Sequence, residues 1–167
     1  MKSKYLIILL LFSLAAITFC NRKNSPQNFI QENEKKAIEK VMKSYKNAIE
    51  NLTTEGTFEL FTEDASVFEQ GKVEGTYKDY IDHHLGPELG HFKSFTFSDY
   101  KINSTISMPY AYTTESYLYT IVLKGDDKSG KEEKTIESKG VATSVLKKIN
   151  GEWKIIHSHS SFRKIKK

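Results

Sequence analysis

Cysteine is almost absent from this sequence of 167 residues, because Cys20 is the only one. A disulfide within the chain is therefore impossible, and the place of Cys20 at the end of an apolar N-terminal stretch argues against a catalytic thiol. The sequence also lacks a glycine-rich phosphate loop, a Gly-x-Ser-x-Gly turn and a dinucleotide fingerprint. No motif thus points to a serine hydrolase or to a nucleotide-binding enzyme.

A long apolar run of membrane-spanning length is missing as well. The basic segment Met1–Lys4 is followed by Tyr5–Phe19, which is apolar or small except for Ser13 and Thr18. This run is shorter than the roughly 20 residues that a helix needs to cross a bilayer, so it is typical of a secretory signal.

The end of this signal resembles that of a bacterial lipoprotein. The matching residues are Ile17-Thr18-Phe19-Cys20, although Phe19 departs from the small residue that usually precedes the cysteine. The resemblance implies lipidation of Cys20 and a cell-envelope protein anchored in a membrane and facing the periplasm or the exterior. Secretion as a soluble protein after cleavage behind Ala15 or Ala16, or an uncleaved anchor, are the alternatives.

A strong excess of one charge is also lacking. The formal net charge is +4, and removal of the signal with Lys2 and Lys4 lowers it to about +2. Outside the signal the basic residues are scattered, apart from the tail Arg163–Lys167, which is typical of a solvated end. A nucleic-acid interface needs a concentrated basic stripe, so we predict no nucleic-acid partner.

The chain divides into four predicted segments, of which one is a folded domain. They are a signal peptide (1–20), a polar tether (21–30), a domain (31–163) and a basic tail (164–167). The length of the domain is sufficient for a real hydrophobic core.

Helices are predicted in the first half of the domain. Between residues 31 and 52 apolar residues recur at spacings of three and four, which predicts a long amphipathic helix. Shorter helices are expected at 57–61 and 77–85, with a turn at 62–64 and a short strand at 65–69 between them. Gly86-Pro87 is expected to end or kink the third helix.

The second half of the domain favours β-structure. Four segments are rich in β-branched and aromatic residues: Phe92–Ile106, Tyr110–Leu123, Lys134–Ile149 and Glu152–Phe162. Asn150-Gly151 is a strong hairpin signal, because both residues tolerate the positive φ of a type I′ turn. Four long antiparallel strands behind three helices predict an α+β domain.

The last strand carries two histidines two residues apart. Side chains at i and i+2 of a strand share a face, so Trp153, Ile155, His157 and His159 are expected on one side. Two imidazoles are therefore predicted to face the same place.

The hairpin register predicts what lies beside those imidazoles. A two-residue loop sets Leu146 opposite Ile155, Ser144 opposite His157 and Ala142 opposite His159. Small neighbours leave a hollow, which predicts a mixed apolar and polar ligand pocket. The alternative is that the histidines lie on a solvated sheet face.

The order of these features resembles a known superfamily over residues 31–162. The motifs are Phe-x-x-Asp-Ala at Phe61–Ala65, a short strand leading to Gly75, and the closing segment Asn150–Ser161 with its Trp153, His157 and His159. Together they resemble the nuclear transport factor 2-like fold in its bacterial SnoaL-like branch.

The resemblance implies a cone-shaped, strongly bent antiparallel meander sheet wrapped around three N-terminal helices, a cystatin-like α+β roll. In that family the open end of the cone holds a small ligand or an active site, and the opposite sheet face often forms a homodimer. Its members include isomerases, cyclases, dehydratases and proteins without known activity, so the fold does not decide the function.

A second histidine cluster lies in the third predicted helix. If that helix continued through Glu88, His84 and Glu88 would share a face at i and i+4. The resemblance places this segment at the cone mouth near the last strand. It implies a zinc or copper site made of His84, Glu88, His157 and His159, with His83 or His91 as alternates. Hydrogen bonds across the mouth, or exposure to solvent, are the other interpretation.

Further site residues are expected on the strand that contains Glu115. If its face lines the cone, burial would raise the pKa of Glu115 as a general base requires, and solvent exposure is the alternative. The predicted catalytic residues are His157, His159 and Glu115. The predicted ligand-binding residues are Trp153, Ile155, Leu146, Tyr117, Tyr119 and Ser144.

Two functions follow from this reading. The first is a lipid-anchored module that binds a small apolar or amphipathic molecule without turnover, with or without a metal. The second is an acid–base enzyme of isomerase, cyclase or hydratase type, in which His157 or His159 moves a proton.

Overall fold

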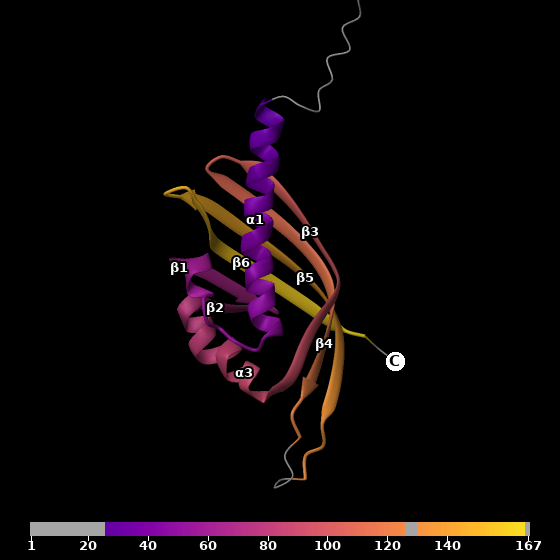
Figure 1. Ribbon diagram of the computed structural model, residues 1–167. Helices are drawn as coiled ribbons and strands as arrows, with labels where there is room; N and C mark the ends of the chain where they lie inside the picture. Colours follow the sequence, from indigo (N-terminus) through magenta and orange to yellow (C-terminus); the bar gives the residue numbers. More distant parts are fainter. Residues whose placement is uncertain (1–25, 126–129, 166–167) are drawn as a thin grey trace, which may run out of the picture.

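The computed structural model describes residues 26–125 and 130–165, which form one bent six-stranded sheet with a long helix across its concave face (Figure 1). The helical elements are α1 (Pro26–Glu50), η2 (Phe58–Leu60), α2 (Tyr77–Tyr80), η3 (Ile81–Leu85) and α3 (Gly86–His91). The strands are β1 (Phe61–Glu69), β2 (Lys72–Thr76), β3 (Phe92–Ser107), β4 (Tyr110–Leu123), β5 (Lys134–Ile149) and β6 (Glu152–Lys164). The predicted α+β cone is confirmed. The predicted signal peptide and Cys20 lie outside the described residues.

Helix α1 is the long amphipathic helix that the spacing of apolar residues predicts. It begins at Pro26, inside the segment predicted as a tether, and ends at Glu50. Leu52 then adopts a left-handed backbone with φ of 54°, and the Thr53 amide donates to the Ala48 carbonyl at 3.0 Å, which closes the last turn. None of the described helices is long and apolar enough to cross a membrane.

The four long strands agree with the predicted segments to within two residues at their ends. Asn150 and Gly151 have φ of 52° and 89°, as a type I′ hairpin requires, and Ile149 lies opposite Glu152. Strands β3 to β6 therefore form the predicted antiparallel meander.

The N-terminal strands extend this meander in a way that the sequence pattern did not predict. Strand order is β2-β1-β6-β5-β4-β3, and β1 pairs in parallel with β6, which makes the sheet mixed. The predicted turn at 62–64 is wrong, because β1 already begins at Phe61 and its pairing with β6 is irregular between Phe61 and Ser66. Pairing between strands so distant in sequence has no local signal.

The third helix does not end at Gly86-Pro87, so the first of the two predicted alternatives, an end rather than a kink, is wrong. The chain passes from α2 through the π-helical turn η3 into α3, and the Gly86 amide donates to the Ile81 carbonyl, five residues back. A Cβ atom on residue 86 would lie 2.4 Å from that carbonyl oxygen, so only glycine fits. The wider turn absorbs Pro87 at the start of α3 and carries the helix on to His91.

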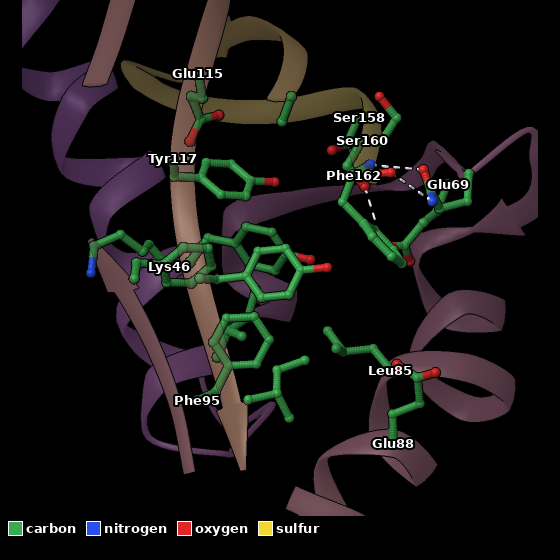
Figure 2. A pocket seen from close by; sticks show the side chains of 18 of the residues that line it. Lys46, Glu69, Leu85, Glu88, Phe95, Glu115, Tyr117, Ser158, Ser160 and Phe162 are labelled. Carbon is green, nitrogen blue, oxygen red and sulfur yellow. Dashed lines mark hydrogen bonds between the residues drawn. The ribbon is translucent and has the colours of Figure 1, made fainter. Parts of the chain in front are cut away.

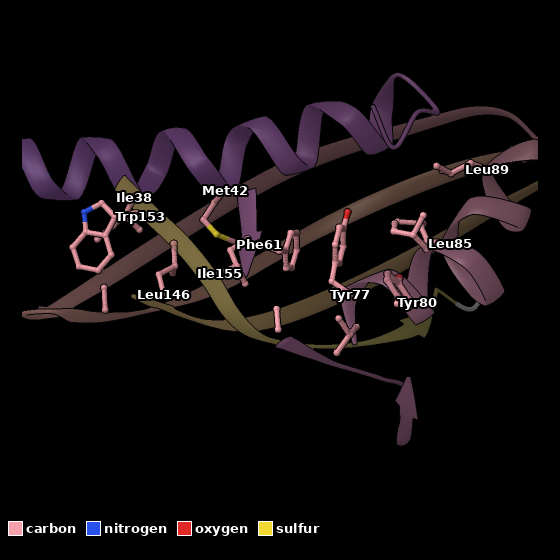
Figure 3. Close-up of a cluster of buried hydrophobic side chains, with 14 of the residues drawn as sticks. Ile38, Met42, Phe61, Tyr77, Tyr80, Leu85, Leu89, Leu146, Trp153 and Ile155 are labelled. Carbon is pink, nitrogen blue, oxygen red and sulfur yellow. The ribbon is translucent and has the colours of Figure 1, made fainter. Parts of the chain in front are cut away.

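A packed core lies between α1 and the sheet and continues towards α2, η3 and α3 (Figure 3). Ile38 of α1 is fully buried in the same cluster as Leu146 of β5 and Ile155 of β6. Trp153 closes this core, and its indole N–H donates to the Glu34 carboxylate at 2.7 Å. The other oxygen of Glu34 pairs with Lys148, and this hydrogen bond lowers the pKa of Glu34. This end of the cone is therefore closed.

Candidate functional site

A cavity of about 480 Å³ opens where the packed core ends, between the second half of α1 and the concave sheet (Figure 2). Phe95, Glu115 and Tyr117 lie on one side of it, and Ser158 and Leu85 lie opposite. Most of the side chains that line it are aromatic or aliphatic. The aromatic ones are Tyr45, Tyr80, Phe92, Phe95, Phe97, Tyr100, Tyr117, Tyr119 and Phe162.

The cavity exists because the central strands present small side chains to it. Ala142 and Ser144 of β5 and Ser158 and Ser160 of β6 all line it. Gly140 continues this row, and a Cβ atom there would lie 2.2 Å from the Tyr117 ring. The aromatic side chains of β3 and β4 thus face a wall with too little side-chain volume to fill the space.

A β-bulge decides which residues of β6 face the cavity. Leu146 lies opposite Ile155 as predicted, but Val145, the neighbour of Leu146 on β5, lies opposite His157. Ile156 is therefore an extra residue of β6 without a partner on β5. The predicted pairing of Ser144 with His157 is wrong, because Ser144 lies opposite Ser158. Beyond the bulge, each side chain of β6 therefore lies on the face opposite to the one that an unbroken alternation predicts.

His157 and His159 therefore do not lie on the face of Trp153 and Ile155. His157 Nδ1 is 2.8 Å from the Ser66 hydroxyl, and neither histidine lines the cavity. Their rings contact Phe68, with centroid distances of 5.3 and 6.4 Å. The prediction that the two imidazoles face the pocket is wrong for this physical reason: one extra residue inverts the alternation of a strand.

The predicted ligand-binding residues separate into two groups. Tyr117, Tyr119 and Ser144 line the cavity. Trp153, Ile155 and Leu146 do not, since they are packed in the closed core beneath α1.

Glu115 lies in the cavity wall and is only 9% exposed. The Tyr100 hydroxyl donates to its Oε2 at 2.5 Å, and across residues 26–125 and 130–165 no hydrogen bond reaches its other oxygen. Burial raises the pKa of Glu115, and the hydrogen bond from Tyr100 lowers it in part. The carboxyl group can therefore hold or accept a proton inside an apolar space.

Burial also raises the pKa of the tyrosines around Glu115. The pKa of Tyr100 is raised well above its usual value by burial and by the neighbouring Glu115. Burial raises the pKa of Tyr119 to about 12. These hydroxyl groups therefore stay protonated and act as neutral hydrogen-bond partners.

The mouth of the cavity holds one imidazole among three carboxylates. His84 Nδ1 is 3.0 Å from Glu74, and His84 Nε2 is 3.4 Å from Glu88 and 3.8 Å from Glu69. The contact with Glu74 is an ion-pair distance without hydrogen-bond alignment. Tyr80 donates to Glu69 at 2.8 Å. The predicted i, i+4 neighbourhood of His84 and Glu88 is confirmed.

The four residues of the predicted zinc or copper site do not come together. His84 and Glu88 are at the cavity mouth, whereas His157 and His159 lie on the other face of β6. The alternates His83 and His91 are exposed. Within residues 26–125 and 130–165 no group of three or more His, Cys, Asp or Glu side chains is arranged to hold a metal ion.

Sequence reasoning missed several residues of the site. Glu69 could have been found, because it follows Ala65 and Val67 at a spacing of two in the predicted strand 65–69. Tyr100 and Ser158 carried no such signal, since their contributions depend on pairing and on the bulge.

Comparisons with known proteins agree with this architecture. The family model described as a SnoaL-like domain matches residues 38–164. No match was found among curated proteins.

Three solved structures illustrate the similarity. A nuclear transport factor 2-like superfamily protein from Salmonella enterica has a TM-score of 0.65 and 20% identity, and the match covers 82% of this chain and 94% of that protein. A candidate ketosteroid isomerase from Shewanella frigidimarina has a TM-score of 0.61 and 27% identity, with 75% and 94% covered. A candidate scytalone dehydratase from Novosphingobium aromaticivorans has a TM-score of 0.60 and 20% identity, with 83% and 87% covered.

Proposed function

The chain belongs to the SnoaL-like domain family, and from this premise we propose that its aromatic cavity binds a small, largely apolar molecule. The cavity carries the proposal. Its volume of about 480 Å³ lies within the range of about 300 to 1,000 Å³ that is usual for small-molecule sites. Apolar walls with a few polar groups are the usual composition of such sites, since the walls supply affinity and the polar groups fix orientation.

Binding can be tested with N-phenyl-1-naphthylamine, a neutral probe whose fluorescence rises in apolar surroundings. We expect a saturable rise with one probe per chain. Ala142→Phe should abolish it, because the new ring projects from β5 into the cavity. The matched control is Val141→Phe on the same strand, where the side chain is 51% exposed and does not line the cavity.

The proposal is wrong if the wild type gives no saturable signal, or if both variants bind the probe as the wild type does. Circular dichroism of the two variants separates lost binding from lost folding.

A second candidate function is acid–base catalysis in the same cavity, and Glu115 favours it. A buried carboxyl with a raised pKa, which accepts a hydrogen bond at one oxygen and has no partner among the described residues at the other, can exchange a proton with a bound molecule. The solved relatives include candidate isomerase and dehydratase proteins, which is consistent with such chemistry.

Turnover can be separated from binding with 2-tetralone, a small ketone with acidic α-hydrogens. An enzyme should accelerate hydrogen–deuterium exchange at its α-carbon in D₂O, followed by NMR, and Glu115→Gln should remove the acceleration. Binding of 2-tetralone without accelerated exchange would leave only the binding function.

We also propose that the protein is attached to the cell envelope through a lipid on Cys20. The support is the sequence of residues 1–20 alone, in which a basic start and a short apolar run end at the single cysteine. Mass spectrometry of the mature protein should find an N-terminal diacylated or triacylated Cys20. An unmodified terminus at another residue would refute the anchor and favour secretion.

The predicted homodimer through the outer sheet face stays a prediction. Tyr112 and Val141 are each 51% exposed on β4 and β5 and would lie in such an interface. Sedimentation equilibrium of the chain without residues 1–20, with Val141→Glu as the disruptive variant, tests it.

A further inference from the structure

Acidic side chains outnumber lysines in the wall of the cavity. Glu69, Glu88 and Glu115 line the cavity. The lysines that reach it are Lys46 and Lys164, and the Lys46 ammonium is already paired with Glu50 at 2.5 Å. Lys164 is exposed near the end of β6. Among the described lining residues, an anionic ligand would therefore meet three carboxylates, a lysine that is already paired and a lysine at the exposed end of β6.

The aromatic wall already accommodates a positive charge. The Lys46 ammonium lies 5.3 Å from the centroid of the Phe97 ring and 5.8 Å from that of Tyr100. The faces of these rings are attractive to cations because of the aromatic quadrupole. Since Lys46 already occupies this place, a second cation would be repelled there, and a charged ligand nitrogen has to lie elsewhere in the cavity.

Three carboxylates gather at the mouth of the cavity. Glu69, Glu74 and Glu88 surround the single imidazole of His84, and Lys72 offsets only Glu74, at 2.7 Å. Burial raises the pKa of Glu88, His84 lowers it, and Glu69 raises it again. Glu69 raises the pKa of Glu88 because two neighbouring negative charges repel each other.

We propose that the molecule held in the cavity is a cationic amphiphile, a protonated amine or quaternary ammonium on an apolar body, with its nitrogen at the mouth between Glu69 and Glu88. This inference rests on the proposed binding function and specifies its ligand class. The apolar body lies between the aromatic side chains of β3 and β4 and the small residues of β5 and β6. The cation supplies positive charge to Glu69 and Glu88, which have no lysine or arginine partner among the described residues.

The nitrogen belongs at the mouth rather than beside Glu115. The Glu88 side chain is 52% exposed, so a charged nitrogen there keeps part of its hydration, whereas at the 9% exposed Glu115 it would lose nearly all of it. Glu115 instead offers a hydrogen bond to a neutral part of the ligand.

The test uses three compounds with the same ring system and different charge. They are 1-naphthylmethylamine, 1-naphthylmethanol and 1-naphthoate, each titrated calorimetrically at pH 7.5 into the domain lacking residues 1–20. We expect the amine to bind about tenfold more tightly than the alcohol and the carboxylate to bind most weakly. Raising the salt concentration from 50 to 500 mM should reduce the preference for the amine, because ions screen exposed charges.

Variants of the cavity carboxylates then test where the charged nitrogen of the ligand lies. Glu88→Gln and Glu69→Gln should each lower the preference for the amine to about threefold and leave the affinity for the alcohol unchanged, since glutamine keeps the shape and the acceptor oxygen. Glu63→Gln, at an exposed carboxylate that does not line the cavity, is the control and should keep the preference. Glu115→Gln tests the alternative position of the nitrogen, and here too we expect the preference to remain.

The outcomes distinguish this inference from the proposed function. If none of the three compounds binds, the binding function itself is wrong. If amine and alcohol bind equally, the cavity binds ligands but the cationic class is wrong. If only Glu115→Gln removes the preference, the position of the nitrogen at the mouth is wrong.

Discussion

Helix α1 covers two regions of one concave sheet, and these regions differ in the size of the side chains that the sheet directs towards the helix. Under its first half the space is filled by large buried side chains, namely Ile38, Leu146, Trp153 and Ile155. Under its second half β5 and β6 offer small ones instead, namely Gly140, Ala142, Ser144, Ser158 and Ser160. The same backbone thus makes a stable core at one end and a cavity at the other.

The difference shows that side-chain volume along two strands separates the stabilising region from the binding region. β5 changes from Leu146 to Ser144 and Ala142 within four residues, and β6 changes at the bulge from Ile155 to Ser158. The closed end therefore contributes most to folding, and the open end can vary its chemistry at a lower cost in stability.

The largest expected effect compares leucines at the two ends. Leu146→Ala, at a 0% exposed position in the filled core, should lower the free energy of unfolding by about 3 kcal/mol. Leu85→Ala should cost only about half as much, because Leu85 is also buried but borders the cavity, so part of its surface faces open space rather than packed atoms. Urea unfolding of both variants measures the difference. Equal losses would contradict the division into a filled and a hollow region.

The next prediction compares the two faces of β6 beyond the bulge. Ser158→Leu should weaken binding of N-phenyl-1-naphthylamine by at least about tenfold, because the side chain enters the cavity. His157→Leu, one residue earlier on the other face, should change the affinity less than about twofold. A reversed order would mean that the histidine face is the concave one.

The pH dependence of stability should reveal Glu115. Its pKa is raised by burial in the folded protein from a usual 4.5, so the folded state holds this proton more tightly than the unfolded state does. Its contribution to stability is therefore full below pH 4.5 and is lost as the pH rises towards the folded pKa. The slope reaches at most about 1.4 kcal/mol per pH unit for one proton.

Glu115→Gln should remove this loss, so the variant gains stability relative to the wild type as the pH rises. Exposed Glu63→Gln serves as the control and should follow the wild type. Urea unfolding between pH 4 and pH 8 measures both. A wild-type curve parallel to that of Glu115→Gln would contradict the burial of an ionisable group in the wall.

The smallest effect concerns the partner of Glu115. Tyr100→Phe removes the hydroxyl that donates to the carboxylate and should cost about 1 kcal/mol in stability at neutral pH. It should also raise the pKa of Glu115 further, since this hydrogen bond is what lowers it. The loss of stability with pH should then extend to higher pH than in the wild type. An unchanged profile would mean that the Tyr100 bond does not act on Glu115.

The parts of the fold that local patterns encode could be predicted from the sequence. Asn150-Gly151 specifies its hairpin because few other pairs tolerate two positive φ angles, and the strand boundaries follow from turn residues. The contact between His84 and Glu88 agrees with their i, i+4 spacing, which required the helix to continue through Glu88. Tyr117, Tyr119 and Ser144 line the cavity as predicted, and Glu115 does so under the condition that its strand face is the concave one.

The features that depend on distant pairing could not be predicted. Ile156 forms the bulge without a glycine or proline to mark it, so the alternation of β6 appeared unbroken and placed His157 in the cavity. Parallel pairing of β1 with β6 brings Glu69 towards His84, and residues this far apart in sequence leave no periodic pattern to read.

The central claim is that the concave face with the small residues, and not the histidine face, is the binding site. The most direct measurement is the set of intermolecular nuclear Overhauser effects from bound N-phenyl-1-naphthylamine to the assigned domain. We predict contacts to the ring protons of Tyr117 and Tyr119 and to the Ala142 methyl group. Contacts to His157, His159 and Val141 without any to Tyr117 or Tyr119 would contradict the account.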